Sequence, residues 1–182
     1  MTSTLYRYKP AIRLFVPDEL FEGSKLTLNE SQAHYLTNVM RQKQGALVEL
    51  FNGRDGSWQA ELVEISSKSV VVNCRICTAF QKKSPDVWLL FAPVKRARLD
   101  FMAQKATELG VSKIWPVETN YCQMGRVKKD RLEANVIEAA EQTVRLDVPD
   151  IGEFVKLNTI LSSWPQDRVL IFCDEGLAGD VP

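Results

Sequence analysis

The hydrophobic residues between positions 87 and 117 follow a strand pattern, then a helix pattern, then a strand pattern again. The apolar run 87–91 leads through a basic loop into a helix whose buried face we expect to be Leu99, Met102, Ala103, Ala106 and Leu109. Gly110 suits the left-handed position after a helix, and the apolar run 111–117 is typical of a second strand. Strand, helix and strand so closely spaced predict a crossover unit, and therefore a parallel sheet with helices packed on it.

The same alternation continues toward the C-terminus. A helix is predicted from Asp130 to about Arg145, and the residues it should bury are Leu132, Val136, Ala140 and Val144. Glu141 and Arg145 lie off this stripe, which favours a solvent-exposed, salt-bridged surface for both. Segment 155–161 has no clear pattern, whereas Arg168–Cys173 is predicted to be a third strand. With few neighbours, that strand would lie at an exposed edge, so we expect a second copy or a further segment to cover it.

The first half of the chain has the pattern of a small β-barrel. Short strands are predicted over 12–16, 46–51 and 70–76, and the turn Asn52–Gly56 leads into a returning strand. The apolar alternation of that strand slips at Val63 and Ile65, which predicts a bulge. The polar stretch 81–85 ends in a proline, so we place a domain boundary there, with domains 1–84 and 85–182. The expected fold is a β-barrel followed by a parallel α/β domain, α+β overall.

One helix interrupts these strands. Asn29 and Gln32 have the spacing of a capping box, and the following helix should bury Ala33, Leu36 and Met40. His34, Asn38 and Arg41 fall on another face. A histidine on a helix is usually structural or solvated, but sharing a face with an arginine keeps an RNA-contacting patch open as the alternative.

Composition and charge exclude several classes of protein. The 182 residues are 45% hydrophobic and 25% charged, no apolar run reaches the length of a membrane span, and the first ten residues lack a secretory signal, so we expect a cytoplasmic protein. Cys74 and Cys77 have metal-hairpin spacing, but no second pair completes four ligands, so no metal site is expected. Residues 1–84 hold 11 Lys and Arg against 8 Asp and Glu, which favours a polyanionic partner weakly.

Familiar nucleotide-binding and nucleophile motifs are absent from the sequence. No Gly-x-Gly-x-x-Gly, Walker loop or Gly-x-Ser-x-Gly elbow occurs, which argues against a Rossmann dinucleotide site, a P-loop and a hydrolase elbow. The residues by themselves therefore predict a barrel joined to a parallel α/β domain, with nucleic-acid binding as one candidate function.

Several segments together resemble the RsmE family of ribosomal RNA small-subunit methyltransferases. The most specific are Gln104–Gly110 and Ala140–Gln142, followed by Arg145 and Val148-Pro149. Further matches lie at Arg13–Val16, at His34 with Val39–Arg41 and Gly45, at Leu50–Gly53 and at Lys95. The resemblance runs from about residue 12 to the end of the sequence.

This resemblance implies a fold, an activity and partners. The fold would be a PUA-like barrel followed by a SPOUT domain, an α/β fold that ends in a trefoil knot and pairs as a homodimer. The activity would be methylation of N3 of a uridine in 16S rRNA of the small subunit, with S-adenosylmethionine as methyl donor. The alternatives left open are a non-catalytic RNA-binding module and a dimerisation module.

The sequence also departs from the family pattern. Thr143 and Val144 stand where the family usually has a small residue and a glycine, and Asn120 and Tyr121 replace an Arg-Ser pair. The glycine-rich loop that holds the donor, and the knot it belongs to, would lie beyond Pro182. We therefore expect an N-terminal part of such an enzyme, with an incomplete SPOUT domain and no activity of its own.

The resemblance finally implies candidate site residues. Arg13 is the candidate catalytic residue, and Gln104, Lys105 and Glu108 are expected to support the fold or the wall of the site. The residues expected to contact RNA are Arg13, His34, Arg41, Arg54, Lys95, Arg96, Arg98, Glu141 and Arg145.

Overall fold

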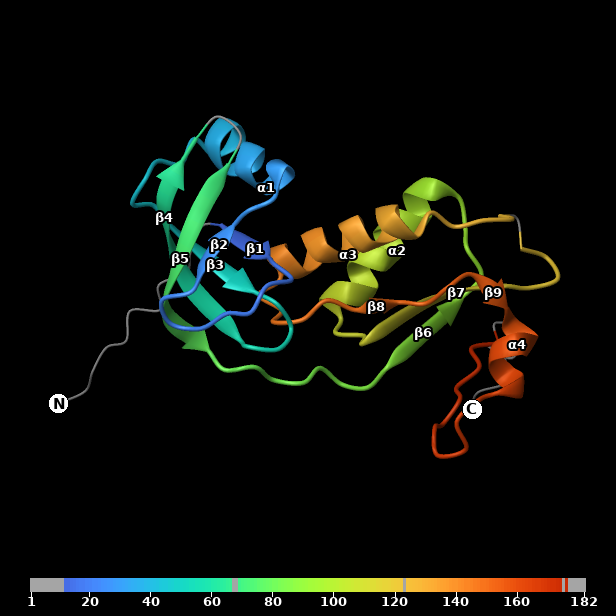
Figure 1. The fold of residues 1–182 in the computed structure, drawn as a ribbon. Helices are drawn as coiled ribbons and strands as arrows, with labels where there is room; N and C mark the ends of the chain where they lie inside the picture. Colours follow the sequence, from blue (N-terminus) through green and yellow to red (C-terminus); the bar gives the residue numbers. More distant parts are fainter. Residues whose placement is uncertain (1–11, 67–68, 123, 175, 177–182) are drawn as a thin grey trace.

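A computed structural model of the chain describes residues 12–66, 69–122, 124–174 and 176. Within these residues the strands form two separate sheets, one in each half of the chain. The first sheet curls around its own core, and the second lies under two helices (Figure 1). Segment 80–87 joins the halves without helix or strand, and the predicted boundary at residue 84 falls within it.

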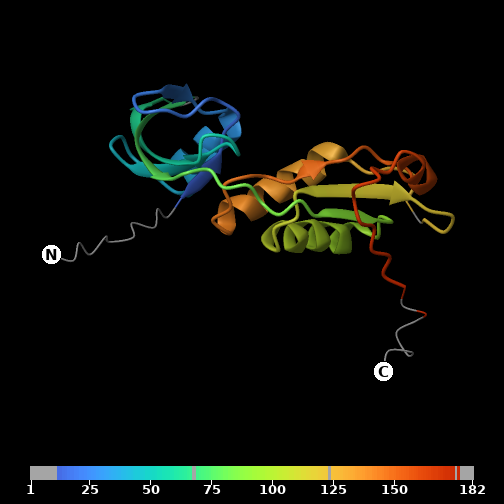
Figure 2. The same ribbon diagram turned by 90° about the horizontal axis from the view of Figure 1, so that it is seen from below.

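The first sheet has five strands in the order β1-β3-β4-β5-β2. It curls into a barrel-like shape (Figure 2). Its strands are β1 (Arg13–Phe15), β2 (Lys25–Thr27), β3 (Leu47–Phe51), β4 (Ser57–Ile65) and β5 (Val70–Ala79). β1 pairs parallel with β3, and the other pairs are antiparallel. The predicted bulge is confirmed, because the β4–β5 register shifts between Leu62 and Glu64. Sequence patterning missed β2, which is only three residues long.

One helical segment packs against this barrel. In α1 (Glu30–His34) the Asn29 side chain accepts a hydrogen bond from the backbone N–H of Gln32, and the Asn29 N–H donates to the Gln32 side chain. This geometry confirms the predicted capping box. The helix continues as the π-helix η1 (Tyr35–Val39), a rare form that often occurs at functional sites.

The second half contains the predicted crossover unit. β6 (Trp88–Phe91) and β7 (Lys113–Glu118) pair parallel, and α2 (Arg96–Glu108) connects them. Gly110 has a φ of 93°, as expected of a residue that ends a helix. The remaining elements are α3 (Lys129–Gln142), β8 (Asp150–Ile151), β9 (Val155–Lys156) and α4 (Leu157–Ser162). Both β8 and β9 pair parallel with β7.

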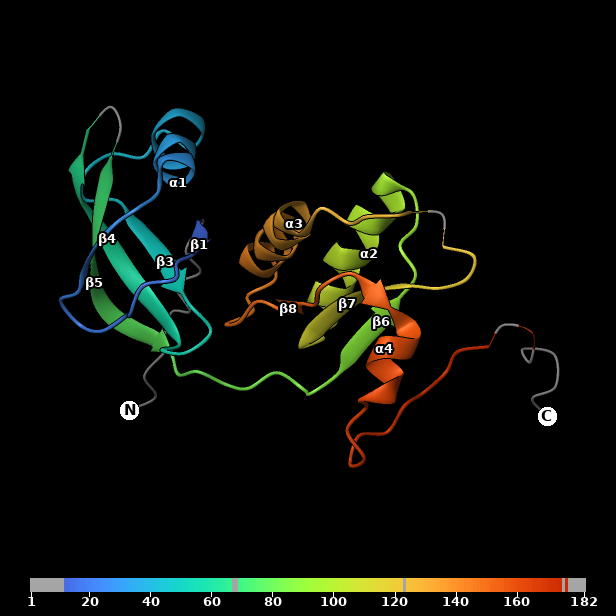
Figure 3. The same cartoon turned by 45° about the vertical axis from the view of Figure 1, so that its right-hand side comes forward.

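Helices α2 and α3 pack side by side on one face of this sheet (Figure 3). Strand residues alternate between the two faces, so Leu89, Phe91 and Ile114 point toward the helices. The buried residues of this core are Leu99, Ala103, Ala106, Ile114, Leu132, Val136 and Ile151.

The other face of the sheet carries tryptophans and cations. The ring of Trp88 meets Trp115 and Trp164 edge-on, at centroid distances of 5.9 Å and 5.8 Å. Lys113 Nζ lies 4.0 Å from the centre of the Trp115 ring, and the Arg168 guanidinium lies 3.8 Å from that of Trp88. Cation–π contacts of this kind contribute roughly 0.5–2 kcal/mol each. They cover part of the sheet face opposite α2 and α3.

The predicted third strand, Arg168–Cys173, is not a strand in the structure. Arg168 forms an ion pair with Asp86 and stacks on Trp88, and beyond it the chain leaves the sheet (Figure 3). Val169 and Ile171 are 84% and 82% exposed. Apolar composition makes a strand only where a sheet edge supplies hydrogen bonds, and this segment pairs with no edge in the described part of the chain.

Both helix ends of the second half differ from the prediction. Leu109 was expected to be buried but is 84% exposed, because α2 ends at Glu108. α3 was expected to reach Arg145 but ends at Gln142, where both the N–H and the hydroxyl of Thr143 donate to the Ala139 carbonyl. Val144, which was expected in the core, is exposed and has a φ of 63°.

A left-handed valine is strained, because its branched Cβ crowds the backbone by roughly 1–2 kcal/mol. Val144→Gly should therefore raise the free energy of unfolding by about 1 kcal/mol, after allowance for the entropy that glycine adds to the unfolded chain. Urea denaturation measures this change. Val144→Ala keeps a Cβ and should gain less, and a glycine variant less stable than the unaltered chain would contradict the assignment of strain.

Candidate nucleic-acid interface

Arg13 reaches from the barrel to the C-terminal end of α3. Its guanidinium donates to the carbonyl oxygens of Ala140, Glu141 and Arg145, at 3.2, 3.4 and 2.8 Å. The last carbonyls of a helix have no partner within the helix and carry the negative end of its dipole. Arg13 therefore caps α3 from a different sheet.

The barrel holds Arg13 in place from the other side. Its Nε donates to Glu49 Oε1 at 2.8 Å, and the Ser57 hydroxyl donates to the same oxygen. The guanidinium also lies 4.7 Å from the centre of the Phe51 ring. Only 5% of the Arg13 side chain is exposed, so its charge is neutralised by Glu49 inside the protein.

Arg145 caps the end of α2, as Arg13 caps the end of α3. Its Nη1 donates to the carbonyl oxygens of Thr107 and Val111, at 2.7 and 3.1 Å, and so caps the end of α2. Its Nη2 donates to Asp147 at 2.9 Å and to the hydroxyl of Ser84 at 3.1 Å. Arg145 thus ties α2 and the segment after α3 to the segment that joins the two halves.

Glu141 forms a third link between barrel and helices. Its carboxylate accepts a hydrogen bond from the backbone N–H of Phe15 at 2.9 Å, while the Phe15 carbonyl accepts one from the Gln32 side chain at 2.7 Å. Burial raises the pKa of Glu141, although the Phe15 N–H and the Arg13 charge oppose that rise.

Three of the predicted site residues therefore meet at one place, which we call the barrel junction: Arg13, Glu141 and Arg145. The sequence placed Arg13 in catalysis and all three in RNA contact, and these roles stay predictions. In the structure the guanidinium groups of Arg13 and Arg145 are buried and donate to carbonyl and carboxylate oxygens of the protein, so they hold the barrel against the helices. The solvated surface favoured for Glu141 and Arg145 is wrong, because Glu141 accepts from the Phe15 N–H and the Arg145 side chain is only 9% exposed.

Other predicted residues are exposed on the barrel. The ring of His34 is hydrogen bonded to the side-chain amide of Asn38 at 2.8 Å, beside Tyr35 and Val39, which are 40% and 59% exposed. Arg41 lies just past the helix in a left-handed conformation, with a φ of 51°, and not on the helical face predicted for it. An exposed aromatic ring next to a cation is the combination that binds single-stranded nucleic acid.

The remaining predicted cations lie on loops. Arg54, in the β3–β4 turn, is exposed and donates to the Pro17 carbonyl at 3.1 Å. Lys95 and Arg98 are exposed at the start of α2, whereas the side chain of Arg96 lies outside what the structure describes. Their contact with RNA stays a prediction.

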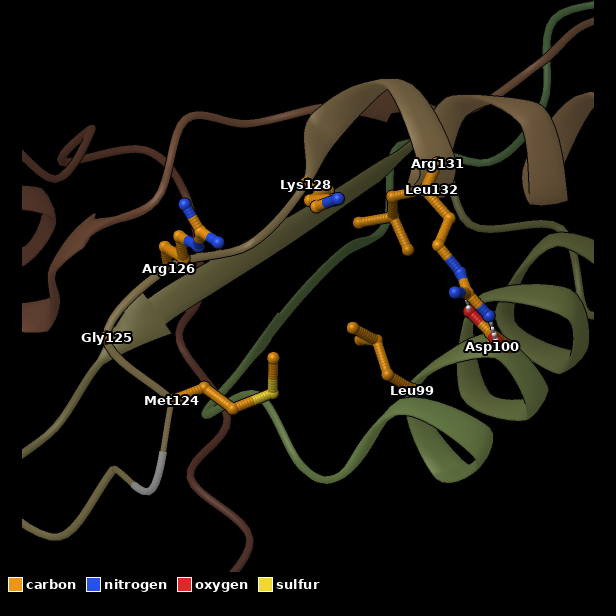
Figure 4. A pocket seen from close by; sticks show the side chains of 8 residues that line it. All are labelled: Leu99, Asp100, Met124, Gly125, Arg126, Lys128, Arg131 and Leu132. Carbon is orange, nitrogen blue, oxygen red and sulfur yellow. Dashed lines mark hydrogen bonds and ion pairs between the residues drawn. The ribbon is translucent and has the colours of Figure 1, made fainter.

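A cavity of about 670 Å³ lies between the starts of α2 and α3 and the loop after β7 (Figure 4). Figure 4 shows the side chains of Leu99, Met124 and Leu132 gathered around it, and Arg131 paired with Asp100. The complete lining is Leu99, Asp100, Met124, Gly125, Arg126, Lys128, Arg131 and Leu132.

The basic residues of this cavity are not among those that the sequence predicted for the site. Arg126, Lys128 and Arg131 carry no motif, and in the sequence they look like ordinary solvated charges. The available signal was their position, because they follow the carboxyl end of a parallel strand, where α/β folds place ligands.

The described residues hold neither a membrane span nor a metal-binding cluster. Each helix there is too short or too polar to cross a bilayer. No group of three or more His, Cys, Asp or Glu side chains is arranged to hold a metal ion in that part of the chain. Cys74 is buried in the barrel core, and Cys77 donates to the Ala79 carbonyl.

Two domain families match the chain. Residues 81–179 match the RNA methyltransferase domain, and residues 28–73 match the RNA methyltransferase PUA domain. The first match covers the parallel sheet and its helices, and the second covers α1, η1, β3, β4 and the start of β5. The class is therefore that of RNA methyltransferases built from these two domains.

Individual relatives narrow this class. The ribosomal RNA small subunit methyltransferase E of Rickettsia conorii is 30% identical over 164 residues, which are 90% of this chain and 66% of that protein. The protein of the same name from Buchnera aphidicola of Acyrthosiphon pisum is 29% identical, over 82% of this chain and 62% of its own length. The crystal structure of the Neisseria gonorrhoeae protein of that name, bound to S-adenosyl methionine, superposes with a TM-score of 0.84 at 25% identity, over 93% of this chain and 73% of that one.

The chain belongs to the ribosomal RNA small subunit methyltransferase E family. It spans slightly less than two thirds of the length of the Rickettsia and Buchnera relatives.

Removal of Arg13 tests the barrel junction. Arg13→Ala leaves Glu49 buried without its partner and the end of α3 without its donors, which should cost about 3–5 kcal/mol of the free energy of unfolding. Denaturation in guanidinium chloride measures the loss. Arg75→Ala is the matched control, because it breaks an exposed 2.7 Å pair with Glu61 and should cost at most about 1 kcal/mol. Equal losses in the two variants would contradict a buried cap.

Glu141 makes a pH dependence testable. Burial, together with the nearby charge of Glu138, raises its pKa, so the folded protein binds this proton more tightly than the unfolded chain does. Stability then falls as pH rises from the ordinary glutamate value, about 4.3, through the higher pKa of the folded state. Glu141→Gln keeps an oxygen that can accept from Phe15 and has no proton to lose. As pH rises through this window, the melting temperature of Glu141→Gln should increase relative to that of the unaltered chain. A difference between the two melting temperatures that stays constant with pH would contradict the raised pKa of Glu141.

Proposed function

We propose that this chain acts in the S-adenosylmethionine-dependent methylation of 16S rRNA of the small ribosomal subunit, at N3 of a uridine. The observation that carries the proposal is the combination of both matched domains with a TM-score of 0.84 to a relative bound to S-adenosyl methionine. A protein with this function acts in the cytoplasm, with the rRNA or the small subunit as its partner.

The reaction itself sets the requirements of the site. S-adenosylmethionine supplies a methyl group on a positively charged sulfonium; the carbon–sulfur bond breaks, a carbon–nitrogen bond forms, and the uridine gives up its N3 proton. Positioning and charge stabilisation are the contributions that a protein makes to such a transfer. The cavity between the starts of α2 and α3 is lined by three cations, Arg126, Lys128 and Arg131, and one carboxylate, Asp100, and this excess of positive charge does not suit a cationic donor.

The described residues would serve this reaction by holding RNA. The exposed side chains of His34, Arg41 and Arg54 lie on the barrel, and those of Lys95 and Arg98 lie at the start of α2. Such groups bind phosphates without reading sequence. The barrel junction keeps the barrel cations in a fixed place relative to the parallel sheet, so an RNA held by the barrel is presented in one orientation.

A second candidate function is a non-catalytic module that binds RNA or forms a homodimer. The exposed apolar run Val169–Phe172 favours pairing, because contiguous apolar surface of this kind marks interaction sites. Size-exclusion chromatography with light scattering distinguishes a dimer from a monomer. It does not test catalysis, which the next experiment addresses.

Deletion of the gene in its own organism tests the proposed activity. A methyl group on N3 blocks base pairing, so reverse transcriptase stops at the modified uridine in 16S rRNA. The stop should disappear from the deletion strain and return when the unaltered gene is restored. A restored Arg41→Ala, Arg54→Ala gene should return a weaker stop, because it lacks two candidate phosphate contacts.

Two results would contradict the proposal. If the stop pattern of 16S rRNA is the same with and without the gene, methylation of N3 is excluded as its function. If the purified chain binds RNA in a salt-independent manner, the phosphate contacts are excluded, because such contacts weaken as salt rises.

A further inference from the structure

The cavity beside α2 and α3 lies at the carboxyl edge of the parallel sheet. The loop after β7 contributes Met124 and Arg126, and the first turns of the two helices contribute Leu99 and Leu132. Ligands of open parallel sheets bind at this edge, since the loops there leave a crevice that the sheet itself cannot fill. Its volume of about 670 Å³ lies within the range of sites for small organic ligands, roughly 300–1,000 Å³.

Charge decides which ligand fits. Arg131 donates to Asp100, and Asn135 donates to the same carboxylate at 2.7 Å, so this pair is internally compensated. Arg126 and Lys128 are exposed and make no side-chain hydrogen bond or ion pair with the residues that the structure describes. The cavity therefore has two uncompensated positive charges, which attract an anion and repel a sulfonium.

The lining also has an apolar part. Leu99 and Leu132 are buried at the base of the helices, and the flexible thioether of Met124 lies opposite them in Figure 4. Methionine is flexible and makes favourable contacts with aromatic rings, and a base turned out of a nucleic acid into a pocket packs between apolar or aromatic side chains. A nucleotide has one group for each part of this lining: a flat base for the apolar side chains and a phosphate for the two cations.

We propose that this cavity binds one nucleotide of the RNA substrate, with a phosphate on Arg126 and Lys128 and the base against Met124, Leu99 and Leu132. The inference rests on the proposed function, which makes RNA the substrate, and adds to it a site in the second half of the chain. The two cations of this site are different from all those that the sequence indicated.

Binding of a fluorescein-labelled, single-stranded oligouridylate RNA to the full 182-residue chain tests the site by fluorescence anisotropy over a range of salt concentrations. The double variant R126Q/K128Q should bind about tenfold more weakly, and the slope of log affinity against log salt should shrink by about 0.7, the value for one single-strand phosphate contact. Met124→Ala should weaken binding and leave the slope unchanged, because it removes base contact and no charge.

The matched control is K82Q/K83Q, which removes the same two charges from exposed lysines outside the cavity. Melting temperatures of all variants identify any loss of folding. If the control and R126Q/K128Q weaken RNA binding equally, the cavity is not a nucleotide site. The same conclusion follows if R126Q/K128Q loses S-adenosylmethionine binding and keeps its RNA binding. If only the barrel variant R41A/R54A loses RNA, the proposed function stands and this inference fails. If the unaltered chain binds no RNA, both fail.

Discussion

The fold depends on two buried arginines that cap helices they do not belong to. Arg13 extends from the first barrel strand to the end of α3, and Arg145 extends from the segment after α3 to the end of α2. Each guanidinium satisfies carbonyls that a helix leaves unpaired and places a cation at the negative end of its dipole. Because Arg13 also donates to the backbone carbonyl of Arg145, the two caps are linked. The barrel, both helices and the connecting segment are thereby held in one arrangement.

This arrangement explains a sequence feature that looks unfavourable when taken alone. Val144 adopts a conformation suited to glycine, immediately before Arg145. The left-handed turn at Val144 brings Arg145 back toward the end of α2, where its hydrogen bonds offset the cost of a strained residue. The strained backbone of Val144 is therefore needed for the buried cap that Arg145 makes.

Much of the fold was predictable from periodicity and turn chemistry. The capping box at Asn29, the β-bulge near Val63 and the left-handed Gly110 depend on neighbours in the sequence, and all three are confirmed. The failures depend on distant contacts. The roles of Arg13 and Glu141 are set by partners about 130 positions away in the chain, and Arg168–Cys173 has strand composition without a sheet edge to pair with. A single sequence does not encode such pairings in any local pattern, so it placed Glu141 on a solvated surface and did not show that Arg13 links the barrel to α3.

The length of α3 has a consequence for the kind of RNA that suits this protein. Its first turn borders the basic cavity and its last turn rests on the barrel, and 14 helical residues separate them by about 20 Å. α3 is thus a fixed spacer between the barrel and the cavity. Under the proposed function, an RNA strand that reaches both would have to cross this distance, so the length of α3 would set how many nucleotides separate the two contacts.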